Sequence, residues 1–150
     1  MDITFNQLNN GWNAEPNVPV PKIEVFGKDI LLSFFVNPYR FKEFQEGEIG
    51  ILRFLNCERY RLGSTNDDGW YRGQCRFSNI APDWGEFYKV SGDRTLLESP
   101  SDWKIVGPDT GEGIHYLFYF RDSTFECVAT GCVIDHRADN SLRRLGVIEL

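Results

Sequence analysis

Residues 114–130 read IHYLFYFRDSTFECVAT, and this stretch decides the fold class. Side chains alternate with a period of two along Ile114–Arg121 and again along Thr124–Thr130. Asp122 and Ser123, which separate the two runs, suit a tight turn. Because aromatic and β-branched residues favour strands, the stretch predicts an antiparallel β-hairpin.

A second hairpin is predicted nearer the N-terminus. Ile23–Phe26 and Ile30–Val36 flank the short Gly27-Lys28-Asp29 loop. Both faces of Ile30–Val36 are largely apolar, so we expect a central strand that is covered on both sides. A long strand is expected at Glu48–Leu62, followed by a turn and a returning strand at Trp70–Phe77. Shorter strands are expected at Asp2–Phe5, Glu86–Val90, Lys104–Val106, Cys132–Asp135 and Leu145–Leu150.

The order of these segments predicts a mainly β protein. No helical stretches separate the strands, which argues against alternating β and α units. We therefore expect antiparallel sheets that form a sandwich or a partly open barrel, with little helix. The length of 150 residues predicts a single β-rich domain over 1–150. Residues 1–21 contain Pro16, Pro19 and Pro21, so we expect an irregular segment packed on this domain through Trp12.

Charge and composition exclude several classes of function. The net charge of −6 gives an acidic surface, which repels phosphate backbones and anionic lipids. We therefore expect no nucleic-acid and no membrane partner. The opening MDITFNQLNN lacks a basic and apolar leader pattern, and a cytoplasmic location is the simplest expectation.

The four cysteines predict no metal site. Cys57, Cys75, Cys127 and Cys132 form no C-x-x-C pair and have no histidine at ligand spacing. Cys57 and Cys75 lie symmetrically about Asn66, so they could face each other across a hairpin. A reducing compartment would keep them as thiols, and whether they pair is left open. No cofactor is expected.

Titratable groups in the Ile114–Thr130 hairpin are the first candidate site. His115 lies in an apolar strand and could act as a base, a ligand or a hydrogen-bonded core residue. Asp122 and Glu126 could share a proton or bind a cation. A carboxylate in an apolar strand needs a partner, and we expect Arg53 or Arg121 to pair with Glu126.

Two further groups are weaker candidates for binding. Asn66 and Asp67 lie at an expected hairpin tip, where turn formation competes with cation binding. Trp12, Trp70 and Trp84 have polar neighbours, an arrangement that suits recognition of a protein or a sugar and equally suits the rim of a core.

The segment FYFRDSTFEC (Phe118–Cys127) resembles a motif of an uncharacterised family of small bacterial proteins, written FxFxDSTFEC. Looser similarity extends over Gly11–Pro21, Leu52–Gln74 and Trp84–Asp93. The resemblance implies a bacterial source and a compact domain, and it implies no activity. Some relatives look like genes near toxin or immunity loci. The motif draws attention to Asn66, Asp67, Asp122, Glu126 and Cys127.

The leading functional hypothesis is a non-enzymatic protein-binding or immunity-type domain. Its basis is the lack of catalytic motifs together with the acidic charge and the many aromatic residues. One alternative is a metal-dependent hydrolase or other enzyme that uses Asp122, Glu126 and His115, which must then converge. Another alternative is a β-barrel that holds a small apolar ligand. The oligomeric state is left open.

Overall fold

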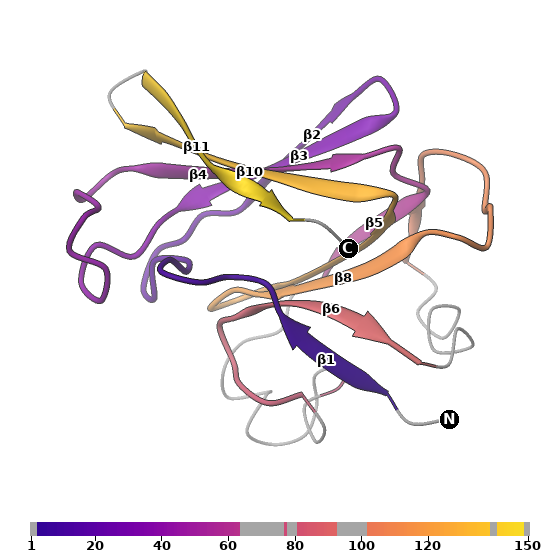
Figure 1. Cartoon of the computed structure of the whole chain (residues 1–150), viewed down its shortest axis with the longest axis horizontal. Coiled ribbons are helices and arrows are strands. Elements are labelled where there is room, and N and C mark those ends of the chain that lie inside the picture. Colours follow the sequence, from indigo (N-terminus) through magenta and orange to yellow (C-terminus); the bar gives the residue numbers. More distant parts are fainter. Residues whose placement is uncertain (1–2, 64–76, 78–80, 93–101, 139–140, 149–150) are drawn as a thin grey trace.

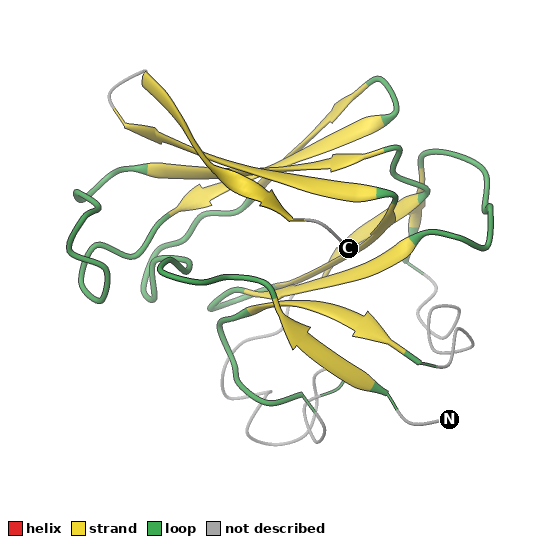
Figure 2. Cartoon of the chain, viewed as in Figure 1, coloured by secondary structure: helices red, strands yellow, loops and turns green. Residues whose placement is uncertain are grey.

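The computed structural model describes residues 3–63, 77, 81–92, 102–138 and 141–148, with the side chains of 135–138 and 141–148 left out. The described residues form eleven strands and no helix, which confirms the expectation of a mainly β chain (Figure 2). The strands are β1 (Thr4–Gln7), β2 (Lys22–Phe26), β3 (Asp29–Phe35), β4 (Ile49–Leu55), β5 (Arg59–Gly63), β6 (Phe87–Ser91), β7 (Lys104–Ile105), β8 (Ile114–Tyr119), β9 (Thr124–Ala129), β10 (Gly131–Ala138) and β11 (Ser141–Ile148).

The strands form two antiparallel sheets. One has six strands in the order β1-β6-β8-β9-β5-β7, and the other has five in the order β11-β10-β4-β3-β2. The sheets lie as two layers, and within the described residues they do not close into a barrel (Figure 1). Of the two predicted architectures, the sandwich is the one observed.

The predicted hairpin at residues 114–130 is confirmed as β8 and β9. Tyr119 pairs with Thr124 beside the turn, and Leu117 pairs with Glu126 further along. Opposed residues of an antiparallel pair share a face, so this register fixes two faces of the six-stranded sheet. The face with Tyr116 packs into the core between the sheets, whereas Leu117 packs into a second cluster on the other face.

Aromatic rings fill the space between the two sheets. Phe34 of the five-stranded sheet meets Phe118 of the six-stranded sheet edge to face, with ring centroids 5.2 Å apart. Phe54 packs in tilted contacts on Tyr116 and Phe125 from the opposite sheet, with ring centroids 5.1 and 5.3 Å away. Because these rings are almost completely buried, they contribute strongly to the hydrophobic stabilisation of the sandwich.

The predicted long strand at Glu48–Leu62 is wrong. The segment forms two strands, β4 and β5, which belong to different sheets. The chain bends between them at Asn56, whose φ is +47°, in the left-handed region that asparagine tolerates. The Asp29 carboxylate holds the bend, because it accepts a hydrogen bond from the Asn56 N–H at 3.0 Å and pairs with Arg53 at 2.7 Å.

The β9–β10 segment also passes from one sheet to the other, beside the β4–β5 segment. β9 pairs with β5 in the six-stranded sheet, and β10, which follows it directly, pairs with β4 in the five-stranded sheet. The N–H and hydroxyl of Thr130 both donate to the carbonyl of Leu55 at this crossing. The β4–β5 and β9–β10 segments therefore each contribute one strand to each sheet, and Figure 1 shows β5 and β10 in different layers.

The hairpin of β2 and β3 is confirmed, but its expected cover on both faces is wrong. Gly27 has a φ of +64°, which fits the first position of a two-residue II′ turn. Ile30, Leu32 and Phe34 are buried between the sheets, whereas Leu31 and Phe35 are only half-buried on the outer face. The physical reason is that the six-stranded sheet packs only on the inner face of β3, so the outer face stays in contact with solvent.

The shorter predicted strands are found with shifted bounds. β1, β6 and β7 replace Asp2–Phe5, Glu86–Val90 and Lys104–Val106. β10 and β11 are longer than Cys132–Asp135 and Leu145–Leu150, because the polar residues between these predictions also belong to the strands. Trp70–Phe77 lies outside the described residues except for Phe77.

Candidate functional site

The most concentrated chemistry surrounds the buried carboxylate of Glu126. Glu126 lies opposite Arg61 of β5 and diagonal to His115 of β8, so all three side chains share one face of the six-stranded sheet. Its Oε1 lies 2.7 Å from His115 Nε2, and its Oε2 accepts a hydrogen bond from Arg61 at 2.8 Å. Glu126 is fully buried, and both of its oxygens have partners.

The network continues from Arg61 to the surface. Arg61 donates two hydrogen bonds to Asp102, at 2.8 and 3.1 Å, and these bonds lower the pKa of the Asp102 carboxyl. Burial acts to lower the pKa of Arg61, but its hydrogen bonds and attraction to Asp102 and Glu126 raise it overall. Arg59 and Arg61 also lie over the ring of Trp103. The guanidinium of Arg61 is therefore fixed between two carboxylates and an aromatic face.

Two of the three residues assigned to the hydrolase hypothesis meet here, and the third does not. His115 and Glu126 are in contact, whereas Asp122 lies in the turn between β8 and β9 with a side chain that is 74% exposed. Asp122 pairs with its neighbour Arg121, whose Nε lies 3.9 Å from the carboxylate. The convergence that the hydrolase hypothesis needs is therefore absent from these three positions.

The predicted partners of Glu126 are wrong. Arg53 pairs with Asp29, and Arg121 contacts Asn17 and Asp122. The observed partner, Arg61, lies directly across the β5–β9 pair, which only the bend at Asn56 brings into the six-stranded sheet.

A histidine oriented by a carboxylate can serve in acid–base chemistry when substrate reaches it. Here His115 is 8% exposed and Glu126 is fully buried. Neither of the two cavities described below includes His115 or Glu126 in its lining. Within the described residues, the arrangement therefore acts as a buried charge network that fixes β5, β8 and β9 to one another.

The aromatic residues predicted as binding candidates lie in different surroundings. Trp12 is buried between the sheets and stacks on Phe34 with ring centroids 5.9 Å apart, so it is a core residue. Trp84 packs on Tyr119 at 4.9 Å, beside a cavity. The positions of Asn66, Asp67 and Trp70 lie outside the described residues.

The cavity beside Trp84 has a volume of about 260 Å³ and lies between the N-terminal segment and the end of β8. Tyr119 and Arg121 also line it. The polar groups of its wall are used within the chain, because Asn13 and Asn37 bond to each other and Glu15 accepts from Asn17 and Val18. It lies outside the ring-filled space between the sheets, where the barrel hypothesis places its ligand.

A second buried carboxylate was missed by the sequence analysis. Glu86 is 8% exposed, and its oxygens accept hydrogen bonds from the side-chain amides of Gln7, Asn9 and Asn13. Arg40 adds an ion pair at 3.6 Å. The cluster ties the N-terminal segment to β6, and the asparagines of residues 9–13 were the available signal.

Three cysteines line the interior as thiols. Cys57, Cys127 and Cys132 are buried and free, and Cys75 lies outside the described residues. Burial raises the pKa of Cys127 well above its ordinary value, with a further contribution from Cys57 beside it. Burial likewise raises the pKa of Cys132. These pKa shifts are typical of structural cysteines rather than reactive ones.

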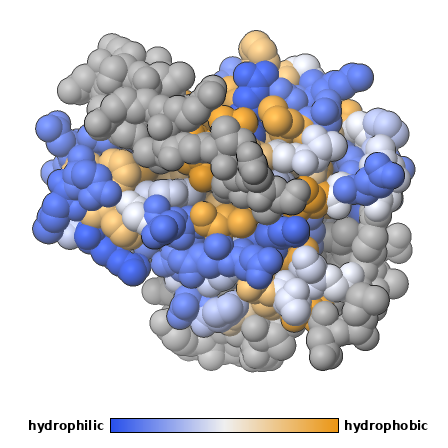
Figure 3. Space-filling model, in the orientation of Figure 1, coloured by the Kyte–Doolittle hydropathy of each residue, from blue (hydrophilic) through white to orange (hydrophobic). Residues whose placement is uncertain are grey.

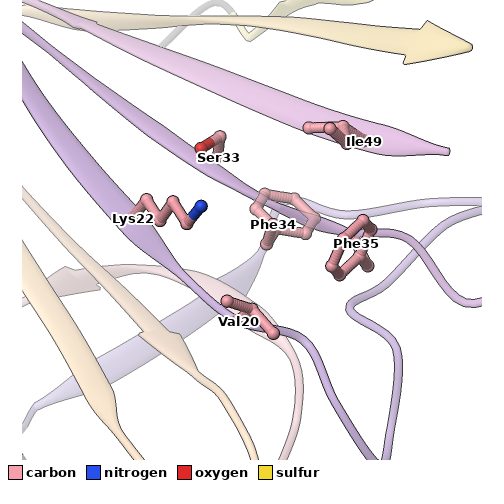
Figure 4. Close-up of a pocket in the computed structure, with 6 residues that line it drawn as sticks. All are labelled: Val20, Lys22, Ser33, Phe34, Phe35 and Ile49. Carbon is pink, nitrogen blue, oxygen red and sulfur yellow. The ribbon is translucent and has the colours of Figure 1, made fainter. Parts of the chain in front are cut away.

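The edge of the five-stranded sheet exposes apolar side chains. Val25 and Phe26 of β2 are 51% and 60% exposed, and Val18 and Val20 precede them at 58% and 41%. A shallow pocket of about 60 Å³ beside this edge is lined by Val20, Lys22, Ser33, Phe34, Phe35 and Ile49 (Figure 4). Figure 3 shows hydrophobic residues interspersed among hydrophilic ones on one face of the molecule. We call residues 18–26 the β2 surface.

The fold places the chain in the class of all-β two-sheet sandwiches. Comparison with protein-family models, curated proteins and solved structures finds no match. Among the described residues, no group of three or more histidine, cysteine, aspartate or glutamate side chains could hold a metal ion. The described part of the chain also has no helix of the length and apolar character needed to cross a membrane.

Proposed function

We propose that this chain is a non-enzymatic protein-binding domain that recognises an extended segment of its partner at the β2 surface. The observation that carries the proposal is the exposed edge strand β2, which ends the five-stranded sheet with large apolar side chains at Val25 and Phe26. Exposed apolar edges of this kind pair with strands from other chains.

The backbone of β2 supports strand pairing. Val36 of the neighbouring segment donates to Glu48 on the β4 side, whereas Phe35 donates to Pro19 on the β2 side. Backbone groups of an extended strand alternate in direction, so Ser33 and Leu31 bond to Lys22 and Glu24 across the β2–β3 pair. The N–H and C=O groups of Ile23 and Val25 consequently point away from β3, toward an incoming strand.

The charges of the surface restrict the partner. Lys22 and Glu24 are both exposed, and both lie on the outer face of β2, two residues apart. A partner strand that runs antiparallel matches them best when it presents a carboxylate opposite Lys22 and a cation opposite Glu24. Opposite charges therefore add specificity to the apolar contacts of Val25 and Phe26.

The immunity-type form of the hypothesis would use an acidic face against a basic target. The net charge of −6 supports it. The β2 surface carries one cation and one anion, so it matches a partner of mixed charge better than a basic one. Inhibition of a basic enzyme remains a prediction from composition.

The test replaces Phe26 with a photo-reactive p-benzoylphenylalanine in cells that naturally produce the chain. Tyr39 serves as the matched control, because it is 55% exposed but lies in the loop before β4. We expect protein adducts from position 26 and not from position 39. We also expect Val25→Pro to abolish them, because it removes an outward N–H that β3 does not use, whereas Val25→Thr keeps that N–H. Equal adducts from both positions, or none from position 26, would refute the proposal.

A further inference from the structure

We propose that the strand that pairs with β2 is β2 of a second copy of this chain, so that the protein forms a two-fold dimer with a continuous ten-stranded sheet. This inference rests on the proposed function and names its partner. It follows from the register that the sequence of β2 permits when the strand is laid antiparallel against itself.

The two-fold axis must pass through one residue of the strand. Opposed residues keep their side chains on a common face, so their numbers differ by an even amount. An axis at Glu24 would oppose two like carboxylates, which is unfavourable. An axis at Ile23 instead places Lys22 opposite Glu24 of the partner subunit and, by symmetry, Glu24 opposite the partner's Lys22. Two ion pairs then form on the outer face of the joined sheet.

The same register satisfies the outward backbone groups. Ile23 has its N–H and C=O directed away from β3, so it exchanges two hydrogen bonds with the partner's Ile23. Val25 donates its N–H to the carbonyl of the partner's Pro21. Proline has no N–H to donate in return. It lies at the end of the paired segment, a position where proline is accepted in β-sheets.

The exposed apolar side chains gain contacts in this arrangement. Val25, 51% exposed, lies opposite the partner's Pro21 on the inner face. Phe26, 60% exposed, reaches the end of the contact on the outer face, where the partner's chain leaves the extended conformation at Val20 (φ +45°). Figure 4 shows Val20 and Lys22 on the side of the shallow pocket away from Ile49. One symmetric contact therefore covers Val25 and brings Phe26 to the edge of the dimer contact.

The test is sedimentation equilibrium of the full chain and of charge variants. Lys22→Glu and Glu24→Lys each turn two attractive cross-strand pairs into two repulsive ones, so each should weaken the dimer about tenfold or more. The double variant K22E/E24K exchanges the charges, restores both pairs and should restore the dimer. Lys42→Glu, an exposed change in the loop before β4, is the control and should leave association unchanged.

The outcomes separate this inference from the proposed function. A monomer at millimolar concentration, or a dimer that ignores both single reversals, overturns the self-pairing. If position 26 then still gives adducts with another protein that Val25→Pro abolishes, protein binding stands and only the identity of the partner is wrong. Circular dichroism of each variant shows whether the monomer keeps its fold.

Discussion

The guanidinium of Arg61 lies 2.8 Å from the fully buried carboxylate of Glu126, across the β5–β9 pair. A buried carboxylate without a cation or hydrogen-bond donors is strongly disfavoured. Arg61 therefore makes it possible for an acidic residue to occupy the interior of the six-stranded sheet, and Asp102 holds Arg61 in place from the surface.

Removal of Arg61 should be costly. Arg61→Met removes the guanidinium that neutralises the fully buried Glu126 carboxylate, and we expect a loss of about 3–5 kcal/mol in the free energy of unfolding. Urea denaturation followed by tryptophan fluorescence measures it. The matched control is Arg53→Met, which breaks a more exposed pair with Asp29 and should cost about 1 kcal/mol or less. Equal losses in the two variants would contradict a special role for Arg61.

The pH dependence of stability should contain a contribution from Asp102. Hydrogen bonds from Arg61 lower the pKa of Asp102 in the folded chain, although burial opposes them. Since the folded pKa lies below the unfolded value of about 3.9, Asp102 stabilises the fold above that value. The contribution is lost as the pH falls through the folded pKa.

Comparison with Asp102→Asn measures this contribution. The side chain of Asp102 is 54% exposed, so we expect solvent screening to limit the difference to about 0.5 kcal/mol at pH 7. The difference should shrink toward zero at pH values below the folded pKa. A difference that grows as the pH is lowered would have the wrong sign and would contradict the Arg61–Asp102 pairing.

The interior cysteines should be unreactive in the folded protein. Burial raises the pKa values of both Cys127 and Cys132, so little thiolate is present at pH 8. We expect a thiol reagent such as DTNB to label both residues in urea and neither in buffer, as mapped by mass spectrometry. Rapid labelling of Cys127 in buffer would show that the space between the sheets opens readily.

A glycine before β8 should resist substitution. A Cβ at Gly113 would collide with the side chains of Glu58 and Val128. Gly113→Ala should therefore lower the free energy of unfolding by about 2 kcal/mol. Gly131→Ala is the control, because its Cβ would meet only Leu55 at 3.9 Å. Thermal melts of the two variants give the comparison, and similar melting temperatures would contradict the close packing around Gly113.

The local hairpins could be predicted from the sequence because their signals are local. The alternation in residues 114–130 and the turn at Gly27 need no knowledge of the rest of the chain. Residues 51–62 contain no glycine or proline, so no strong turn signal marks the change of sheet. Asn56, which adopts a positive φ, was the one local signal of the bend.

The candidate site was harder to predict than the hairpins. The apolar neighbours of Glu126 in the sequence predicted that its carboxylate needs a cation. Which cation that is could not be predicted, because Arg61 reaches Glu126 only through the pairing of strands more than sixty residues apart. The exposed side of β3 was misjudged because its composition resembles that of a strand buried on both faces. If β2 pairs with another copy, this edge and the apolar residues beside it become part of a larger sheet.

A 1:1 mixture of the Lys22→Glu and Glu24→Lys variants tests self-pairing most directly. One variant then carries two carboxylates at positions 22 and 24 and the other carries two cations, so only the mixed dimer has complementary charges. At a concentration near the dissociation constant of the unchanged dimer, sedimentation equilibrium should show each variant alone as mainly monomer. The mixture should shift toward a dimer of twice the 17.3 kDa chain mass. A mixture that sediments no differently from its separate components would contradict the pairing of β2 with itself.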